Sequence, residues 1–276
     1  MAHDVIKLPS ADRITSWKSF NRHVRPLGCS FLKRLPEFPD SVLISGCQRS
    51  GTTALANVLT QSDGMVNYYV SKHGELDAAL ILAGIVPHDP HGRYCFQTTY
   101  VNECYREYFD PDLRFKMIWV IRNPLSVIYS MTHNWKDFAL NDLFLASGRK
   151  CMEDGVKKTL SAWVPGVVSR IDRACYAYIG KTMHVFELIE KLGPETLAVV
   201  DYDHLVLDKS RILPRLYQFI NLPYNEKYAD SLNPGSVSKA QQFSTDEKSR
   251  IEALCQPIYQ RALELVPGHL RATGAV

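Results

Sequence analysis

The 276-residue chain lacks several features that would restrict its class at once. Lys and Arg total 32 against 29 Asp and Glu, so the net charge is only +3, without the basic excess typical of a general nucleic-acid binder. No stretch approaches the roughly 20 uninterrupted apolar residues of a membrane span, and the N-terminus has no apolar core of a signal peptide. Seven cysteines without a framework spacing predict reduced thiols in a cytoplasmic protein.

The composition is that of a folded protein, with 46% apolar and 22% charged residues. We expect a basic N-terminal extension over residues 1–40, with one short helix whose charged face is solvated. One domain is expected over 41–265, followed by a C-terminal tail over 266–276. The sequence does not fix the oligomeric state, and a homodimer stays open.

Short β-branched runs alternate with helical segments after residue 40. The runs that predict strands are 41–45, 65–70, 115–121 and 196–200. The segments that predict helices are 54–59, 76–85, 100–109, 125–134, most of 137–194, 212–220 and a last one from 244. The segments that predict loops are 86–98 and 231–243. This alternation indicates a three-layer α/β domain of the P-loop NTPase-like class, with a central parallel sheet flanked by helices.

The first predicted strand runs into Gly46-x4-Gly51 and then into a helix, as in a phosphate-binding loop. Backbone N–H groups of such a loop point inward, and the N-terminus of the helix adds positive potential. Arg49 supplies a cation within the loop. Hydroxyl groups follow at Ser50, Thr52 and Thr53. The alternative is a tight turn that needs its glycines only for geometry.

The chain does not have the metal-binding residues of a nucleotide triphosphatase. Thr52 stands where the loop lysine would contact the β- and γ-phosphates, and strand 115–121 runs into Arg122 without an Asp for Mg²⁺. A loop with Arg49 as its cation therefore suits a smaller anionic group and no metal. A metal-dependent nucleotide kinase is one alternative, and a non-catalytic nucleotide-binding module is another.

A second anion site is expected where strand 115–121 ends. Arg122 lies at the carboxyl end of this strand, where α/β folds bind ligands. Ser130 follows eight residues later, within about 80° on the same helical face if the segment is helical. The two anion sites together predict one nucleotide with phosphates at both its 5′ and its 3′ position.

These motifs resemble those of the sulfotransferase superfamily, which transfers a sulfuryl group from 3′-phosphoadenosine 5′-phosphosulfate (PAPS). Residues 45–53 resemble the family's 5′-phosphosulfate loop, and Arg122-Asn123-Pro124-x5-Ser130 resembles its 3′-phosphate motif. Segments 201–205 and 235–239 resemble two later motifs, with Asp203 where Glu is usual. The likeness is closer to bacterial and carbohydrate-type members, because aryl sulfotransferases carry a Trp where this chain has Ala54.

The resemblance implies a role for individual residues. Arg49 would hold the leaving 5′-phosphate, and Arg122 with Ser130 would hold the 3′-phosphate. Tyr202 would contact adenine, and Ser238 or Lys239 would close over the nucleotide. The other residues to which the resemblance assigns a role in binding the donor are Gln48, Ser50, Gly51, Thr52 and Thr53.

The resemblance also implies a general base, because the acceptor hydroxyl or amine must lose a proton. In this superfamily the base is a His or Glu after the second strand, which points to the residues after the predicted strand 65–70. Glu75 is the first candidate and His73 the second, and a solvated loop charge is the alternative for each. Positioning and cationic stabilisation of the leaving phosphate would carry the rest of the in-line displacement.

The loop before residue 105 holds further candidates. A zinc site from His88, His91, Cys95 and Cys104 matches no standard spacing, and the reaction needs no metal, so we assign none. The aromatic residues that could line an acceptor pocket are Tyr94, Phe96, Tyr100, Trp135, Phe138 and Trp163. The near-neutral charge favours a small-molecule acceptor over a polysaccharide, and a carbohydrate or glycolipid acceptor is the alternative.

Overall fold

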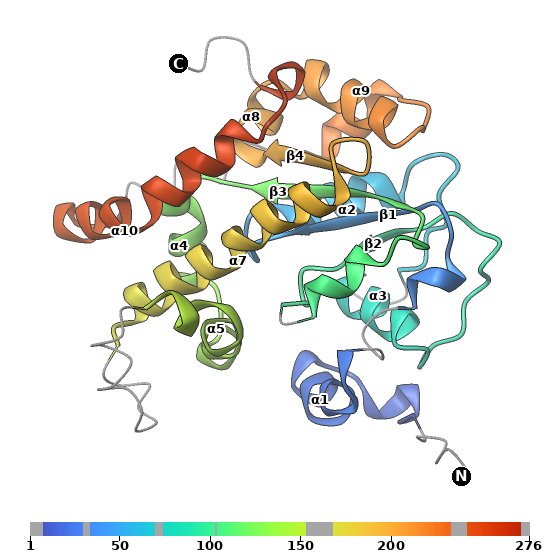
Figure 1. The fold of residues 1–276 in the computed structure, drawn as a ribbon, viewed down its shortest axis with the longest axis horizontal. Coiled ribbons are helices and arrows are strands. Elements are labelled where there is room, and N and C mark those ends of the chain that lie inside the picture. Colours follow the sequence, from blue (N-terminus) through green and yellow to red (C-terminus); the bar gives the residue numbers. More distant parts are fainter. Residues whose placement is uncertain are drawn as a thin grey trace.

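A sheet of parallel strands forms the centre of the protein. The computed structural model describes residues 8–29, 34–69, 74–102, 104–152, 168–232 and 242–271. Within these residues the strands are β1 (Ser41–Gly46), β2 (Cys95–Gln97), β3 (Phe115–Ile121) and β4 (Leu197–Asp201). Their order is β2-β1-β3-β4, so β1 pairs with β2 on one side and with β3 on the other (Figure 1).

Burial on both faces explains why these strands consist of apolar runs. Val42 and Ile44 of β1 and Val199 of β4 are fully buried. Parallel strands that are covered on both sides do not show the alternation of polar and apolar residues typical of a half-exposed strand. The strands predicted at 41–45, 115–121 and 196–200 are confirmed, with shifts of at most one residue at their ends.

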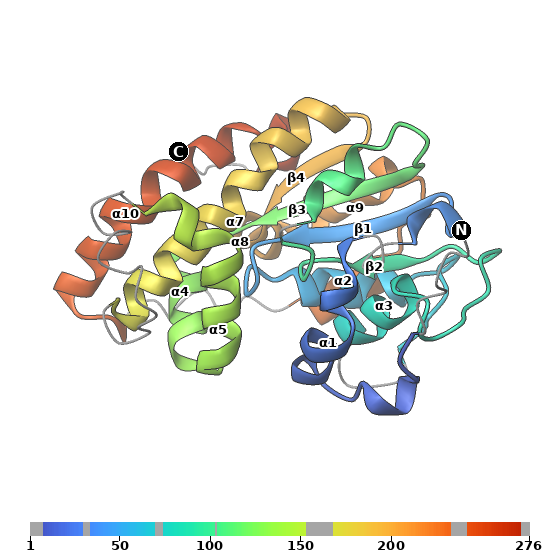
Figure 2. The same ribbon diagram turned by 60° about the horizontal axis from the view of Figure 1, so that its bottom comes forward.

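Helices cover both faces of the sheet and complete three layers. Their bounds are α1 (Trp17–His23), α2 (Thr52–Thr60), α3 (Gly74–Leu82), α4 (Pro124–His133), α5 (Asp137–Leu143), α7 (Arg170–Leu192), α8 (Tyr202–Leu207), α9 (Lys209–Phe219) and α10 (Thr245–Glu264). Figure 2 shows α7 and α10 on one side of the sheet and α2 and α3 on the other. The predicted P-loop NTPase-like α/β architecture is confirmed.

Capping residues in the sequence mark the starts of two helices. Pro124 is the first residue of α4, and the Asn123 side chain accepts a hydrogen bond from the Leu125 N–H at 2.9 Å. α10 begins after Ser244, which forms a capping box with Glu247. Both helices were expected at these positions, and both are confirmed.

The second strand of the sheet differs from the prediction. Residues 65–69, which the structure describes, form no strand, and β2 lies instead within the segment predicted as a loop. β2 has only three residues, and it pairs with the centre of β1 from Val42↔Cys95 to Ile44↔Gln97. A run of three residues carries no period of its own, so the strand conformation of β2 depends on its pairing with β1.

One predicted helical segment is shorter than expected, whereas the described residues of 137–194 are largely helical, as predicted. Among the described residues of the segment 100–109, only Tyr105–Phe109 are helical, as a 3-10 helix. α5 ends at Leu143, and a π-helical turn (Phe144–Gly148) follows it. A Cβ on Gly180 of α7 would lie 2.2 Å from the Ser147 carbonyl oxygen, so α7 packs directly against this turn.

The N-terminal segment is joined to the rest of the chain by a disulfide. Cys29 and Cys104 are bonded, with their Cα atoms 5.4 Å apart, so the prediction of seven reduced thiols is wrong for this pair. Because 75 residues separate the two cysteines, no local spacing could reveal the bond. The cytoplasmic assignment rested on reduced thiols and loses that support. The expected short helix is present as α1, but its Phe20 is fully buried in the main core.

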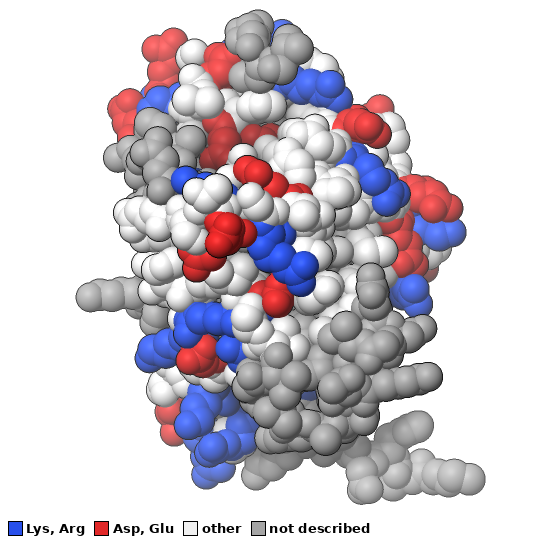
Figure 3. All heavy atoms as spheres, turned by 90° about the vertical axis from the view of Figure 1, so that its left-hand side faces the viewer, with Lys and Arg blue, Asp and Glu red and all other residues white. Residues whose placement is uncertain are grey.

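Surface charge and hydropathy agree with the composition. On the face shown in Figure 3, Lys and Arg are interspersed with Asp and Glu over the described surface. Among the described residues, no helix combines the length and the apolar character that crossing a membrane requires.

Candidate active site

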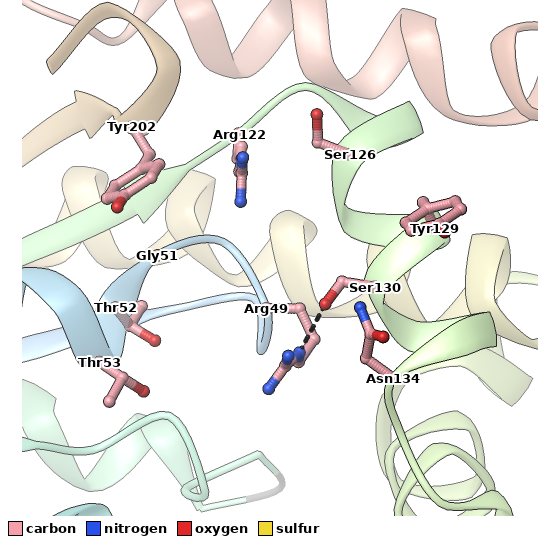
Figure 4. Close-up of a pocket in the computed structure, with 10 residues that line it drawn as sticks. All are labelled: Arg49, Gly51, Thr52, Thr53, Arg122, Ser126, Tyr129, Ser130, Asn134 and Tyr202. Atoms are coloured by element: carbon pink, nitrogen blue, oxygen red, sulfur yellow. Dashed lines mark hydrogen bonds between the residues drawn. The ribbon is translucent and has the colours of Figure 1, made fainter. Parts of the chain in front are cut away.

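The strand order places a ligand site at the carboxyl ends of β1 and β3. The chain passes from β1 to β2 on one side and then crosses to β3 on the other side, and ligands of α/β folds bind at such a switch point. The loop that leaves β1 and Arg122, which follows β3, line one pocket of about 230 Å³. Figure 4 labels the ten residues that line it.

Two glycines give the phosphate loop its shape. Gly46 has a φ of 143°, and a Cβ there would lie 2.3 Å from the Val120 carbonyl oxygen of β3. Gly51 has a φ of 94°, and a Cβ there would lie 2.3 Å from the Tyr202 ring. Only glycine permits both the left-handed backbone and these close approaches. The predicted strand-loop-helix arrangement is present, with α2 beginning at Thr52.

Hydroxyl groups of the loop are available to an anion. Gln97 of β2 donates from Nε2 to Thr52 Oγ1 at 3.2 Å and to Thr53 Oγ1 at 3.0 Å. Because both hydroxyl oxygens accept from Gln97, their own hydrogens can be donated elsewhere. Ser50 is fully buried, and its Oγ has no hydrogen-bond partner among the described residues. These groups fit a phosphate or sulfate, and Gln97 was missed because β2 was predicted as a loop.

Two arginines supply the positive charge of the pocket. Figure 4 shows Arg122 entering from the end of β3 and Arg49 from the phosphate loop. Burial and the positive charge of Arg122 lower the pKa of Arg49. Arg49 donates from Nε to Ser130 Oγ at 2.8 Å, so Ser130 of α4 links to the loop arginine. An anion between the two guanidinium groups would relieve their mutual repulsion.

Asp203 holds Arg122 in place. Arg122 is 5% exposed, and its Nε donates to Asp203 Oδ1 at 3.0 Å. The other carboxylate oxygen of Asp203 accepts from the Asn123 N–H at 3.2 Å. The Arg122 guanidinium also lies over the Tyr202 ring, 5.0 Å from its centroid. The sequence marked Asp203 only as a departure from the family pattern, whereas the structure shows it orienting the cation of the predicted second anion site.

Glu75 lies beside a second pocket. It is the second residue of α3, and its carboxylate accepts hydrogen bonds from the Thr99 hydroxyl and the Tyr100 N–H. Burial raises the pKa of Glu75 to about 7, and the Thr99 hydrogen bond and the charges of Lys181 and Arg49 oppose this rise. His73, Ser238 and Lys239 lie outside the described residues.

The second pocket has a volume of about 70 Å³ and aromatic walls. Its aromatic residues are Trp17, Tyr100, Trp135 and Phe138. Gln48 lines this pocket, whereas its neighbour Arg49 lines the first, so the phosphate loop forms part of both. Trp17 was missed because the N-terminal segment carries no motif.

Some predicted lining and ligand residues lie elsewhere. Tyr94 and Phe96 are 1% and 0% exposed and stack on each other in the core, so they line no acceptor pocket. Trp163 lies outside the described residues. Cys104 is bonded to Cys29, so it is not available to the zinc site considered above.

The fold and the two pockets define an α/β protein of the P-loop class, with an arginine-lined pocket that suits an anionic ligand. Residues 106–254 match the sulfotransferase domain family. The chain therefore belongs to this family and is a sulfotransferase. No match was found among curated proteins.

Solved structures of sulfotransferases share the fold. The sulfotransferase domain from the curacin biosynthetic pathway is 14% identical, with a TM-score of 0.53, and the match covers 78% of this chain and 97% of that one. The sulfotransferase domain of the Synechococcus PCC 7002 olefin synthase is 15% identical, with a TM-score of 0.53 and coverages of 82% and 94%. Retinol dehydratase in complex with retinol and PAP is 14% identical, with a TM-score of 0.50 and coverages of 88% and 87%.

Proposed function

We propose that the protein transfers a sulfuryl group from PAPS to a hydroxyl or amine of a small-molecule acceptor. The observation that carries this proposal is the meeting of Arg49 and Arg122, from the ends of β1 and β3, in one pocket. A nucleotide with phosphates at two positions matches two cations on separate strands. Membership of the sulfotransferase family and the PAP found in the retinol dehydratase complex support the choice of donor.

The residues of the first pocket suit the two ends of this donor. Thr52, Thr53 and Arg49 would hold the 5′-phosphate, together with the backbone N–H groups from Ser50 to Thr52. Arg122, held by Asp203, would hold the 3′-phosphate. Tyr202 offers its ring in the same pocket. When bound, PAPS supplies an activated sulfuryl group with a phosphate as leaving group. Arg49 would offset the negative charge that develops on that phosphate, a role that Mg²⁺ plays in many phosphoryl transfers.

Glu75 is the proposed general base. A carboxylate with a pKa of about 7 is partly ionised at neutral pH and basic enough to accept the proton of an acceptor hydroxyl or amine. Because Glu75 lines the second pocket, the proposed acceptor would lie between this carboxylate and the donor site. The aromatic walls favour a small acceptor that presents a ring or an apolar surface.

Calorimetric binding of PAP, the desulfated donor, tests the site. We expect binding to the wild type and a loss of roughly 10- to 100-fold in Arg122→Ala, as for a lost charged hydrogen bond. Arg211→Ala is the matched control, because Arg211 also pairs with an aspartate, Asp208, at 2.7 Å, but does not line the pocket. Full affinity in Arg122→Ala would refute the assignment of the two anion sites.

Turnover with labelled PAPS and a panel of small alcohols, phenols, amines, sugars and glycolipids tests the reaction. Transfer to a small acceptor without added Mg²⁺ is the expected result. An ATP- and Mg²⁺-dependent transfer would favour a nucleotide kinase, and tight PAP binding without turnover would favour a non-catalytic binding module. Transfer only to sugars or glycolipids would replace the proposed acceptor class.

A further inference from the structure

Three side chains from distant elements hold the loop that carries the hydrogen-bond donors to Glu75. This loop, residues 98–102, follows β2, and each side chain donates to one of three consecutive backbone carbonyls. The pairs are Gln48 Nε2 to Thr99 (3.0 Å), Arg25 Nη2 to Tyr100 (2.8 Å) and Lys181 Nζ to Val101 (3.0 Å). The loop is therefore held from the phosphate loop, the N-terminal segment and α7 at the same time.

Lys181 differs from the other two donors in its burial. It lies within α7 at 0% exposure, and its Nζ is 5.7 Å from the centroid of the Trp119 ring. Transferring an ammonium group from water to a protein interior carries a large desolvation penalty, which favourable interactions with nearby groups must offset. Lys181 lines neither of the two site pockets, so a ligand bound in either of them would not contact it.

Charged and titratable groups surround Glu75 from several elements, and two of them, Arg25 and Asp142, line the same pocket and pair with each other at 2.7 Å. Lys181 of α7 and Arg49 of the phosphate loop both favour its ionised form, and Lys181 has the larger effect. Tyr69 and Tyr100 are the neighbouring titratable groups from the preceding segment and from loop 98–102. Arg49 lines the donor pocket, so the negative charge of a bound donor would offset its effect on Glu75. Lys181 would then be the main remaining cation beside the base.

We propose that Lys181 is a positioning residue that holds loop 98–102 against Glu75 and acts as its counter-charge while an anionic donor occupies the neighbouring pocket. This inference rests on the proposed function, because that function gives Glu75 its role as the base. The contact between Lys181 and the loop, and the field of its ammonium at Glu75, do not depend on that function.

The test compares Lys181→Met with Lys209→Met at saturating PAPS. Lys209 is a matched control, because its Nζ also donates to backbone carbonyls, those of Ala229 (2.8 Å) and Leu232 (3.1 Å), away from the site. We expect the pH profile of kcat/KM for the acceptor to move up by about one pH unit in Lys181→Met, as for the loss of one nearby charge. The profile of Lys209→Met should coincide with that of the wild type.

Lys181→Gln separates the two roles and serves if Lys181→Met does not fold. Its amide can still donate to the Val101 carbonyl but carries no charge, so the same pH shift is expected with a smaller loss of maximal rate. A lower rate with an unmoved profile in both variants would reduce Lys181 to a structural residue and overturn the proposal.

A measurement without turnover distinguishes failure of this inference from failure of the proposed function. The effect of Glu75→Gln on the free energy of unfolding is measured across a pH series, once in the wild type and once in Lys181→Gln. The pH above which this effect stops growing reports the ionisation of Glu75 in the folded protein, and it should rise in Lys181→Gln. An unchanged pH overturns the inference, even in a protein that transfers sulfate. A rise in this pH in a protein that transfers no sulfuryl group supports the inference and refutes the proposed function.

Discussion

Replacing Glu75 by Gln should make the protein more stable at neutral pH and less active. Burial raises the pKa of Glu75 from 4.5 to about 7, so the folded protein binds this proton more tightly than the unfolded chain. Stability therefore falls as the pH rises from about 4.5 to about 7, because the unfolded chain ionises first. Gln cannot ionise, and its amide oxygen can still accept the hydrogen bond from Thr99.

The size of the effect follows from the pKa difference. At about 1.4 kcal/mol per pH unit, the ionised carboxylate lowers the free energy of unfolding by at most roughly 3 kcal/mol above pH 7. Glu75 is partly exposed in the second pocket, and this exposure reduces the effect below that upper value. Below about pH 4.5 the wild type and Glu75→Gln should have the same stability.

Urea unfolding at pH 4, 6 and 8 measures this difference. Glu187→Gln is a control of opposite sign, because hydrogen bonds from Tyr105 and Arg106 lower the pKa of Glu187, so its removal should reduce stability at pH 8. Transfer by Glu75→Gln should fall by roughly 100- to 10,000-fold, as for loss of a general base, with PAP affinity kept. Equal stability of Glu75→Gln and the wild type at pH 8 would show that the carboxylate is not destabilised by burial, and full turnover would show that Glu75 is not the base.

Three further changes test other parts of the structure. Asp203→Asn leaves Arg122 buried without its counter-charge, so the free energy of unfolding should fall by about 3 kcal/mol in a thermal or urea experiment, and PAP should bind more weakly. An unchanged stability and an unchanged PAP affinity would contradict the positioning role of Asp203. Trp17→Ala should raise the KM for the acceptor about tenfold through lost aromatic contact while PAP affinity stays constant; an unchanged KM would remove α1 from the acceptor site. Cys29→Ser should lower the free energy of unfolding by about 4 kcal/mol under non-reducing conditions, because the bond to Cys104 closes a long loop. If the wild type is equally stable with and without a reductant, the bond is not formed.

The parts of the fold that could be predicted are those fixed by local sequence. β1 and β3 are mainly apolar strands of six and seven residues, and helices cover both faces of the sheet that they form. The phosphate loop could be found because its glycines, Gly46 and Gly51, have a fixed spacing between strand and helix. β2 has three residues and takes its conformation from pairing with β1, so no pattern within it could reveal it.

In the candidate site, too, residues within motifs of fixed spacing could be predicted, whereas contacts between distant residues could not. Arg49, Arg122 and Ser130 belong to motifs with fixed spacing, and the structure brings them to one pocket. Asp203 is 81 residues from Arg122, and Lys181 is 80 residues from Val101. Contacts over such separations depend on how the elements pack, so the sequence could not show which charges would meet. The predicted position of Glu75 came from family resemblance, although the strand assumed to precede it is absent from residues 65–69.

The N-terminal segment has a consequence for how the protein can be shortened. A chain begun at residue 41 would keep every motif that resembles the family. It would nevertheless lose the indole of Trp17 from the second pocket, the guanidinium of Arg25 from the backbone beside that pocket, and the buried ring of Phe20 from the core. We expect such a truncated chain to be less stable and to lack part of the pocket that would select what it sulfates.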